Sequence, residues 1–192
     1  MGRPLILASG SQRRKDLLES AGFAFEVVPP EVEELEPGTF PFRKLCAANA
    51  ALKARAVRAR HPEAVVLGAD TMVGLGGRVL GKPASMAEAM EMLASLAGRA
   101  HEVCTGVCLA GPEEECVFFE VTWVRFRKIG REVINEYLER VEVLDKAGAY
   151  AIQEHGDMLV DKIEGEYDNV VGLPVTRVCA ELERLGVRRE EA

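Results

Sequence analysis

The sequence lacks the features that define a membrane protein or a general nucleic-acid-binding protein. Its apolar runs are far shorter than the roughly 20 residues that a membrane-spanning helix needs. No long apolar segment with a cleavage site follows the N-terminus, so we expect a cytoplasmic protein without a signal peptide. The net charge is −7, which disfavours broad binding to DNA or RNA but allows a local basic pocket. We therefore expect neither a nucleic-acid partner nor a membrane partner.

The sequence also lacks several motifs that would define a catalytic class. Its five cysteines are an odd number without paired spacing, which is typical of buried thiols in a reducing compartment. Its three histidines are scattered, which disfavours a zinc site. It contains neither G-x-S-x-G nor G-x-x-x-x-G-K-[ST], and no G-x-G-x-x-G follows the first predicted strand. These absences argue against a serine hydrolase, a P-loop enzyme and a regular Rossmann domain.

What the sequence contains is the pattern of an α/β protein. With 192 residues, of which 48% are apolar, it can form one domain or one domain with two lobes. Early strand–helix units and a central hairpin predict a mixed sheet with flanking helices. We expect strands at 4–9, 25–29, 63–70, 102–110 and 117–127, two short strands flanking 154–157, and helices at 12–21, 42–60, 86–97, 131–141 and 174–185.

The segment between the first strand and the first helix has the residues of an anion site. Backbone N–H groups at a helix N-terminus favour an anion, and Ser9 and Ser11 add hydroxyl groups. Arg13 and Arg14 add guanidinium groups, which suit phosphate. This pattern favours a polyphosphate ligand, although a capped helix with two solvated arginines would have the same sequence.

Carboxylates in two places are candidates for a metal site. Asp70 follows an apolar strand and precedes a glycine turn, where its oxygens could bind Mg²⁺ beside substrate phosphates. The alternative is an Asp that only initiates the turn. An acidic loop at 31–34 could supply a second carboxylate, but spacing does not say which residue.

Three lysines and a glutamine complete the candidate residues. Lys53 lies in an Ala-rich helix, Lys82 in the turn sequence GKP, and Lys146 in DKAGAY. Each is either a surface lysine or, if they converge near the two arginines, part of a triphosphate pocket. Gln153 could contact a base edge through its amide or help to hold a metal.

These segments resemble the Maf family of nucleotide pyrophosphatases. Single motifs are weak, but the matching segments run in family order across nearly the whole chain. They are LASGSQRRKDLL (7–18), VEE (32–34), LKA (52–54), GADTMV (68–73), LGKP (80–83), LAGRAHEVCTGV (96–107), LDKAGAYAIQ (144–153) and VVGLP (170–174). DKAGAY and GADT are similar to the branch that acts on dTTP and UTP.

The resemblance implies an inosine-triphosphatase-like fold for residues 1–192, with two lobes around a central cleft, and a homodimer. It implies hydrolysis of dTTP and UTP, or of modified pyrimidine triphosphates, to the monophosphate and pyrophosphate with Mg²⁺ or Mn²⁺. The family's site positions fall on Ser9, Arg13, Arg14, Glu33, Lys53, Asp70, Lys82 and Gln153. Asp70 resembles the general base, Glu33 and Asp70 the metal ligands, and Arg13, Thr71 and Gln153 positions tied to pyrimidine choice.

Three departures from the family pattern bear on the substrate. Gln12 stands where proline is usual, and Ala151 and Glu154 stand where glycine is frequent, so that Glu154 places a negative charge near the expected base site. Two other functions therefore remain open: a pyrophosphatase for a modified purine nucleotide such as methylated GTP, and a non-catalytic nucleotide-binding regulator of cell division.

Overall fold

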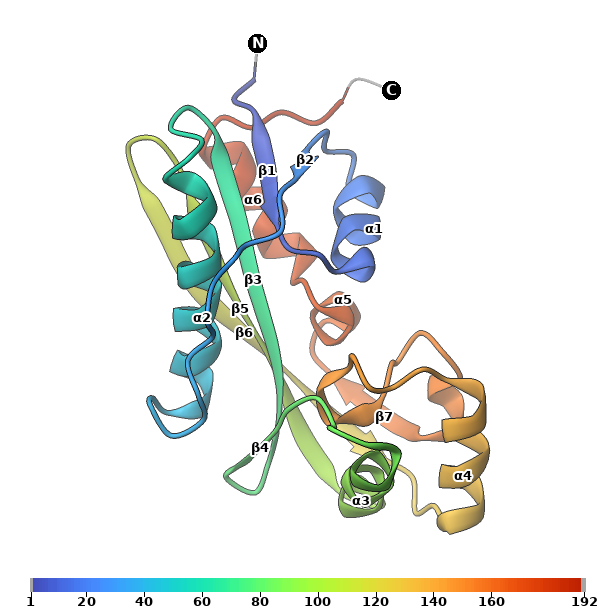
Figure 1. The fold of residues 1–192 in the computed structure, drawn as a ribbon. Coiled ribbons are helices and arrows are strands. Elements are labelled where there is room, and N and C mark those ends of the chain that lie inside the picture. Colours follow the sequence, from blue (N-terminus) through green and yellow to red (C-terminus); the bar gives the residue numbers. More distant parts are fainter. Residues whose placement is uncertain (1, 191–192) are drawn as a thin grey trace. The chain divides into compact units, whose positions relative to one another are not determined.

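The computed structural model describes residues 2–190, which form six α-helices and seven strands (Figure 1). The strands are β1 (Leu5–Ala8), β2 (Glu26–Val27), β3 (Val65–Leu75), β4 (Arg78–Leu80), β5 (Ala100–Ala110), β6 (Glu115–Phe126) and β7 (Val160–Glu164). The helices are α1 (Gln12–Ser20), α2 (Phe42–Arg58), α3 (Met86–Leu96), α4 (Arg131–Arg140), α5 (Tyr167–Val171) and α6 (Val175–Arg184). Short 3₁₀ turns span Ala147–Ala149 and Gly156–Met158. Within these residues, no helix is both long and apolar enough to cross a membrane.

The strands form one mixed sheet, as the sequence predicts. Their order is β2-β1-β3-β5-β6-β7, and β4 pairs with β3 outside this path. β1 runs parallel to both β2 and β3, with Leu7 opposite Val27 and Leu67. The β3–β4 and β6–β7 pairs are antiparallel.

Contacts divide the chain into two compact units. The first unit runs to Asp70 and also contains Thr105–Glu120 and the chain from Gly172 onward. The second unit consists of Thr71–Cys104 and Val121–Val171. Strands β3, β5 and β6 each contribute residues to both units.

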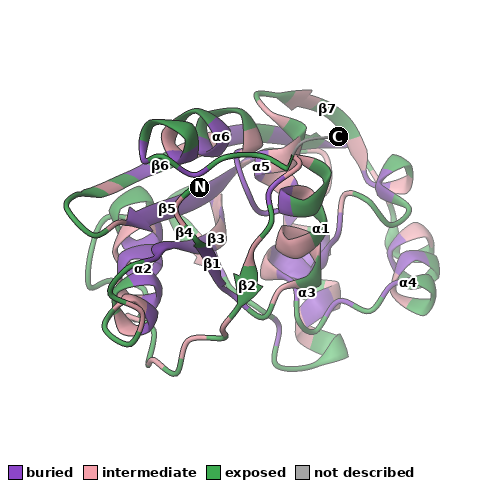
Figure 2. Ribbon diagram, turned by 90° about the horizontal axis from the view of Figure 1, so that it is seen from above, coloured by how far each residue is buried: buried purple, intermediate pink, exposed green. Residues whose placement is uncertain are grey.

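In the first unit, helices cover both faces of the strands. Because side chains alternate along a strand, Leu5 and Leu7 of β1 join a core with α1 and α6, while Ile6 and Ala8 join a core with α2. Figure 2 shows β1 and β3 as buried strands. Gly68 allows α2 to lie close to the sheet, because a Cβ there would be 2.4 Å from the Ala50 carbonyl oxygen.

The second unit has its own core between α3, α4 and the strand ends. Leu93 and Leu96 of α3, Tyr137 of α4 and Phe126 of β6 are fully buried in it. His101 of β5 is also buried, and its ring packs edge-on against Phe126 and Tyr150.

Three sequence expectations differ from this structure. β3 does not end at Asp70 but continues to Leu75, because the turn lies at Gly76 and Gly77, whose φ values of 56° and 83° suit a two-residue hairpin turn. Of the two strands expected to flank 154–157, only β7, which follows this loop, is found, because a 3₁₀ turn at Ala147–Ala149 and irregular residues precede the loop. Helix α5 was not expected, since five residues carry too little periodicity to predict it.

Candidate active site

The loop between β1 and α1, residues 9–11, brings its polar groups together around Ser9. Ser9 is buried, and its Oγ accepts hydrogen bonds from the Ser11 backbone N–H and from Arg14 Nη1, both at 3.2 Å. Arg14 Nε also donates to the Gly172 carbonyl oxygen at 2.9 Å. Ser11 caps α1 in position but forms no capping bond with its side chain. The loop is therefore ordered by Arg14, which fixes the helix N-terminus that the sequence assigns to an anion.

A charged cluster, defined as Glu34, Lys53 and Asp70, lies in the same unit. Lys53 Nζ of α2 is 2.7 Å from Asp70 Oδ1 of β3 and 2.9 Å from Glu34 Oε1. The Lys53 and Asp70 side chains are about nine-tenths buried, whereas half of the Glu34 side chain is exposed. Burying one charge alone would cost several kcal/mol, so each member of this pair requires the other.

Asn49 connects this cluster to the acidic loop. It lies one helical turn before Lys53, and its Nδ2 is 3.5 Å from Asp70 Oδ2. Its side-chain amide also accepts from the Leu35 N–H at 2.8 Å and donates to the Leu35 carbonyl at 3.3 Å. The fully buried Asn49 therefore fixes the loop next to Glu34. Sequence reasoning missed Asn49, although its i, i+4 spacing from Lys53 was a usable signal.

Electrostatics link the charged cluster to the opening loop. Burial lowers the pKa of Arg14, while the Asp70 and Glu34 carboxylates raise it and Arg13 lowers it. The charges of both carboxylates therefore act on the Arg14 guanidinium. Arg14 of the first helical turn and the carboxylates of Asp70 and Glu34 are therefore coupled electrostatically within the first unit.

The structure favours Glu34 over Glu33 as the second carboxylate. Both glutamates are exposed, but Glu34 contacts Lys53 and so shares a cation with Asp70. The sequence named Glu33 on the family pattern, and its role as a metal ligand stays a prediction. Because the two glutamates are adjacent, substituting each in turn tests which of them is the second carboxylate.

The second unit carries Thr71, Lys82, Lys146 and Gln153. Thr71 follows Asp70 on β3, and Lys82 lies in the exposed turn after β4. Gln153 is exposed, beside a buried Ala151. Lys146 is buried, donates to the Glu142 carbonyl oxygen and to Asp145 Oδ1, and lies 3.7 Å from Glu154 Oε1. Lys146 is therefore shared by two carboxylates, and Asp145 lies nearer to it than Glu154, the residue that departs from the family pattern.

The residues of the charged cluster fit a divalent cation held jointly with a substrate. Asp70 and Glu34 already share one positive group, the Lys53 ammonium. In the part of the chain that the structure describes, no group of three or more His, Cys, Asp or Glu could hold a metal ion. Mg²⁺ commonly binds through one or two carboxylates and completes its coordination with phosphates and water. Glu34 and Asp70 are the residues that would hold it.

Comparison with solved structures first defines the class of fold. The Staphylococcus aureus Ham1 protein superposes with a TM-score of 0.56, over 95% of this chain and 99% of that chain, at 17% sequence identity. At this identity the likeness shows the fold alone, and it confirms the predicted inosine-triphosphatase-like class.

Comparison with sequences then gives the family. The model of Maf-like proteins matches residues 4–185, so the chain belongs to the Maf family. A protein of Akkermansia muciniphila is 46% identical over 185 residues, covering 96% of this chain and 98% of its own. One from Symbiobacterium thermophilum is 50% identical over 182 residues, covering 95% and 94%. Both relatives bear the name dTTP/UTP pyrophosphatase.

Proposed function

We propose that this protein hydrolyses dTTP and UTP to the nucleoside monophosphate and pyrophosphate, with Mg²⁺ or Mn²⁺. The observation that carries this proposal is the charged cluster, in which buried Asp70 is held by Lys53 within the electrostatic reach of Arg14. Membership of the Maf family and the names of the two relatives support the substrate. The five cysteines, four of which are buried thiols, support a reducing and therefore cytoplasmic location.

The chain's own residues have distinct tasks in this reaction. Lys53 fixes Asp70 through Oδ1, and we assign Oδ2 to orienting the attacking water and accepting its proton. The water oxygen bonds to the α-phosphorus as the bond from that phosphorus to the bridging oxygen breaks, and pyrophosphate leaves. Arg13, Arg14 and the N–H groups of Ser11 and its neighbours bind phosphate oxygens and stabilise the growing charge. A bound divalent cation supplies further charge neutralisation on the phosphates.

The proposal gives the residues of the second unit the roles that the family pattern assigns. Lys82 binds phosphate, and Thr71 and Gln153 contact the base.

A panel of nucleoside triphosphates tests the proposed function. The panel contains dTTP, UTP, CTP, dATP, GTP and methylated GTP, each with Mg²⁺, Mn²⁺ or a chelator, and pyrophosphate and orthophosphate are measured separately. We expect dTTP and UTP to react fastest, to release pyrophosphate, and to need the cation. Faster release from methylated GTP would replace the pyrimidine assignment. Tight binding without turnover would favour a nucleotide-binding regulator.

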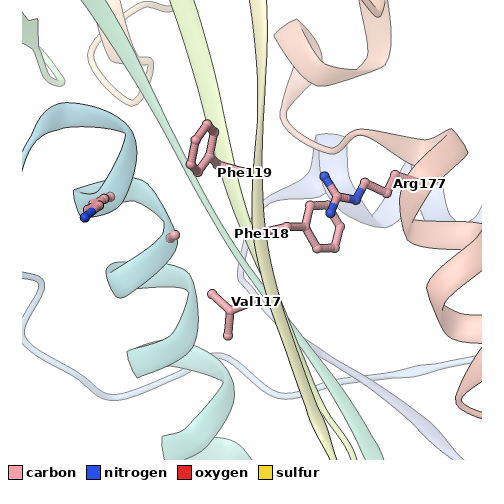
Figure 3. Close-up of a pocket in the computed structure, with 6 residues that line it drawn as sticks. Val117, Phe118, Phe119 and Arg177 are labelled. Atoms are coloured by element: carbon pink, nitrogen blue, oxygen red, sulfur yellow. The ribbon is translucent and has the colours of Figure 1, made fainter.

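We also infer that two copies of the chain pair through the outer edge of β6. β7 pairs with β6 only from Trp123 to Phe126. Beside the earlier part of β6 lies a hollow of about 390 Å³ lined by Val117, Phe118, Phe119, Arg177 and two residues of α2, Lys44 and Ala47. Figure 3 shows Val117 and Phe119 pointing toward α2, and Phe118 toward Arg177 on the other side. Since successive residues of one strand line it, the hollow follows the strand edge.

A second copy fits this edge because the edge is self-complementary. Antiparallel pairing about Phe118 would place Val117 opposite Phe119 twice, and both side chains are exposed in the single chain. Nearby charges are already paired within the chain, Glu115 with Arg55 and Glu120 with Arg177, so two copies could approach without uncompensated repulsion. An exposed apolar strand edge favours pairing with another chain, and this pairing would cover it.

Sedimentation of wild-type protein and a Phe119→Lys variant tests this interface. We expect a dimer for wild type and a monomer for the variant, while Trp123→Lys, which changes a similarly exposed aromatic residue at a position already paired with β7, stays dimeric. A monomeric wild type, or a dimeric Phe119→Lys variant, would exclude pairing through this edge.

A further inference from the structure

The segment around Gln153 has an unusual backbone. Among the described residues, the two non-glycine residues with positive φ are Ala149 at 61° and His155 at 53°, and both lie within residues 148–155. Ala149 is fully buried. Such conformations persist only where the surroundings hold them, and they cluster at functional sites. We call residues 148–155 the Gln153 segment.

One hydroxyl group holds both backbone groups of a residue in this segment. Tyr137 Oη of α4 donates to the Ala151 carbonyl oxygen at 3.2 Å and accepts from the Ala151 N–H at 2.9 Å. Burial raises the pKa of Tyr137 to about 12, so its hydroxyl stays protonated and can act in both ways. The clamp lies two residues before Gln153, where it limits how far the backbone that carries Gln153 can move.

Neighbouring contacts fix the rest of the segment. Tyr150 Oη is 2.9 Å from His101 Nε2, and its ring packs edge-on against Phe126. The Gly148 N–H donates to the Gly81 carbonyl oxygen at 3.0 Å, directly before Lys82. A Cβ on Gly148 would lie 2.9 Å from Val73 Cγ2. The segment is therefore tied to the core of its own unit and to the turn that carries Lys82.

We infer that Tyr137 is a positioning residue for nucleotide choice: by clamping Ala151 it holds the Gln153 amide in one place relative to the Lys82 turn. The inference rests on the proposed function, because it takes Gln153 as the group that contacts the base. A fixed amide binds its base without first being ordered, whereas a mobile amide adapts to several bases. Tyr137 thereby affects selectivity without contacting substrate.

Selectivity separates this role from simple stabilisation of the core. Tyr137→Phe keeps the ring and removes both hydrogen bonds. Thr122→Val is the matched control, because the Thr122 hydroxyl is also buried in the second unit, donates to the Glu166 carbonyl at 2.9 Å and accepts from Asn169 at 3.1 Å. Both variants lose two hydrogen bonds of one hydroxyl, but only the first loses a bond to the Gln153 segment.

The measurement is the ratio of kcat/KM for UTP to kcat/KM for GTP. For Tyr137→Phe we expect the ratio to fall about tenfold, mainly through a higher KM for UTP, as the loss of a site's hydrogen bonding reduces discrimination. For Thr122→Val we expect a lower unfolding temperature and an unchanged ratio. Hydrogen exchange in wild-type protein gives a test that requires no variant: the Ala151 amide should exchange as slowly as amides of β5.

The outcomes distinguish this inference from the proposed function. An unchanged ratio in Tyr137→Phe, together with a lowered ratio in Gln153→Ala, overturns the positioning role and leaves the proposed function standing. An equal fall in Thr122→Val, or rapid exchange of the Ala151 amide, also overturns the positioning role. Unchanged selectivity in Gln153→Ala overturns the base contact on which it rests, and a wild type that cleaves neither dTTP nor UTP removes the proposed function itself.

Discussion

The two units of the protein hold their candidate site residues in different ways. In the first unit, charged side chains hold one another, since Lys53 binds both Asp70 and Glu34. In the second unit, the Gln153 segment is held through its backbone by Tyr137, while the Gln153 side chain itself is exposed. The first arrangement fixes charges, which suits chemistry on a triphosphate. The second fixes a shape, which suits the choice of a base.

The largest expected effect tests the chemical side of this comparison. Asp70→Asn removes the charge and the basicity of Asp70 but keeps a group of the same shape beside Lys53. We expect turnover of UTP to fall roughly 10²–10⁴-fold, the usual loss for a general base. We also expect a lower unfolding temperature but a folded protein, because Lys53 loses one carboxylate and keeps its ion pair with Glu34. Steady-state kinetics and circular dichroism measure the two effects. Wild-type rates in the folded variant would remove Asp70 from this role.

The next effect is on the stability of the second unit and concerns His101, whose ring packs against Phe126 and Tyr150. Burial lowers the pKa of His101 to about 4, below its ordinary value of about 6.5. Between these values the unfolded chain binds a proton that the folded chain does not, so stability falls as pH falls through this range. We expect this residue to contribute a loss of up to about 3 kcal/mol between pH 7 and pH 4.

Denaturant unfolding at a series of pH values measures this loss. Protonation of carboxylates such as Glu115, whose pKa is lowered by Arg55, also reduces stability in acid. A His101→Phe variant therefore serves to isolate the contribution of the histidine. We expect the variant to have a shallower dependence on pH between about 6.5 and 4. The same slope in both proteins would contradict a neutral, buried His101.

A third, smaller effect tests how the opening loop is ordered. Arg14→Lys keeps the charge but cannot bind Ser9 Oγ and the Gly172 carbonyl oxygen with the same planar group. We expect KM for UTP to rise about tenfold with a smaller change in kcat. Arg3→Lys, at a partly exposed arginine paired with Glu113 in the same unit, is the control and should leave KM unchanged. Equal kinetics for both variants would show that Arg14 contributes only charge.

The smallest effect decides between two adjacent glutamates. Glu34→Gln removes the ion pair with Lys53, so we expect kcat/KM to fall about fivefold and the Mg²⁺ requirement to rise, as for a lost metal carboxylate. Glu33→Gln should stay within about twofold of wild type, as exposed substitutions usually do. Kinetics at varied Mg²⁺ concentration measure both. The opposite ranking would restore Glu33, the residue favoured by the family pattern.

The sequence predicted most of the fold because its elements have strong local signals. The long helix that became α2 and the apolar runs that became β1 and β3 need no tertiary information to be recognised. The end of β3 was misplaced because Asp70 resembles a turn residue, and only its pairing with Lys53 explains a carboxylate inside a buried strand. Local pattern thus gives the elements, while long-range pairing decides where a polar residue can be buried.

The same limit applies to the candidate site. Asp70, Lys53 and Arg14 were predicted because their residue types suit phosphate chemistry. Glu34 and Glu33 are neighbours in a loop without periodicity, so their spacing could not rank them, and the choice of Glu33 came from the family resemblance alone. The sequence pattern places Tyr137 among the apolar residues on the inner side of a helix. Its role could not be predicted, because its hydrogen bonds to Ala151 join two separate elements.

The division of labour between the units is tested most directly by measuring turnover and nucleotide choice in the same two variants. Asp70→Asn and Gln153→Ala would each be assayed for pyrophosphate release from UTP and from GTP. We predict that Asp70→Asn slows both reactions by the same factor and leaves their ratio unchanged, whereas Gln153→Ala lowers the ratio and largely keeps kcat for UTP. A changed ratio in Asp70→Asn with normal selectivity in Gln153→Ala would contradict the account.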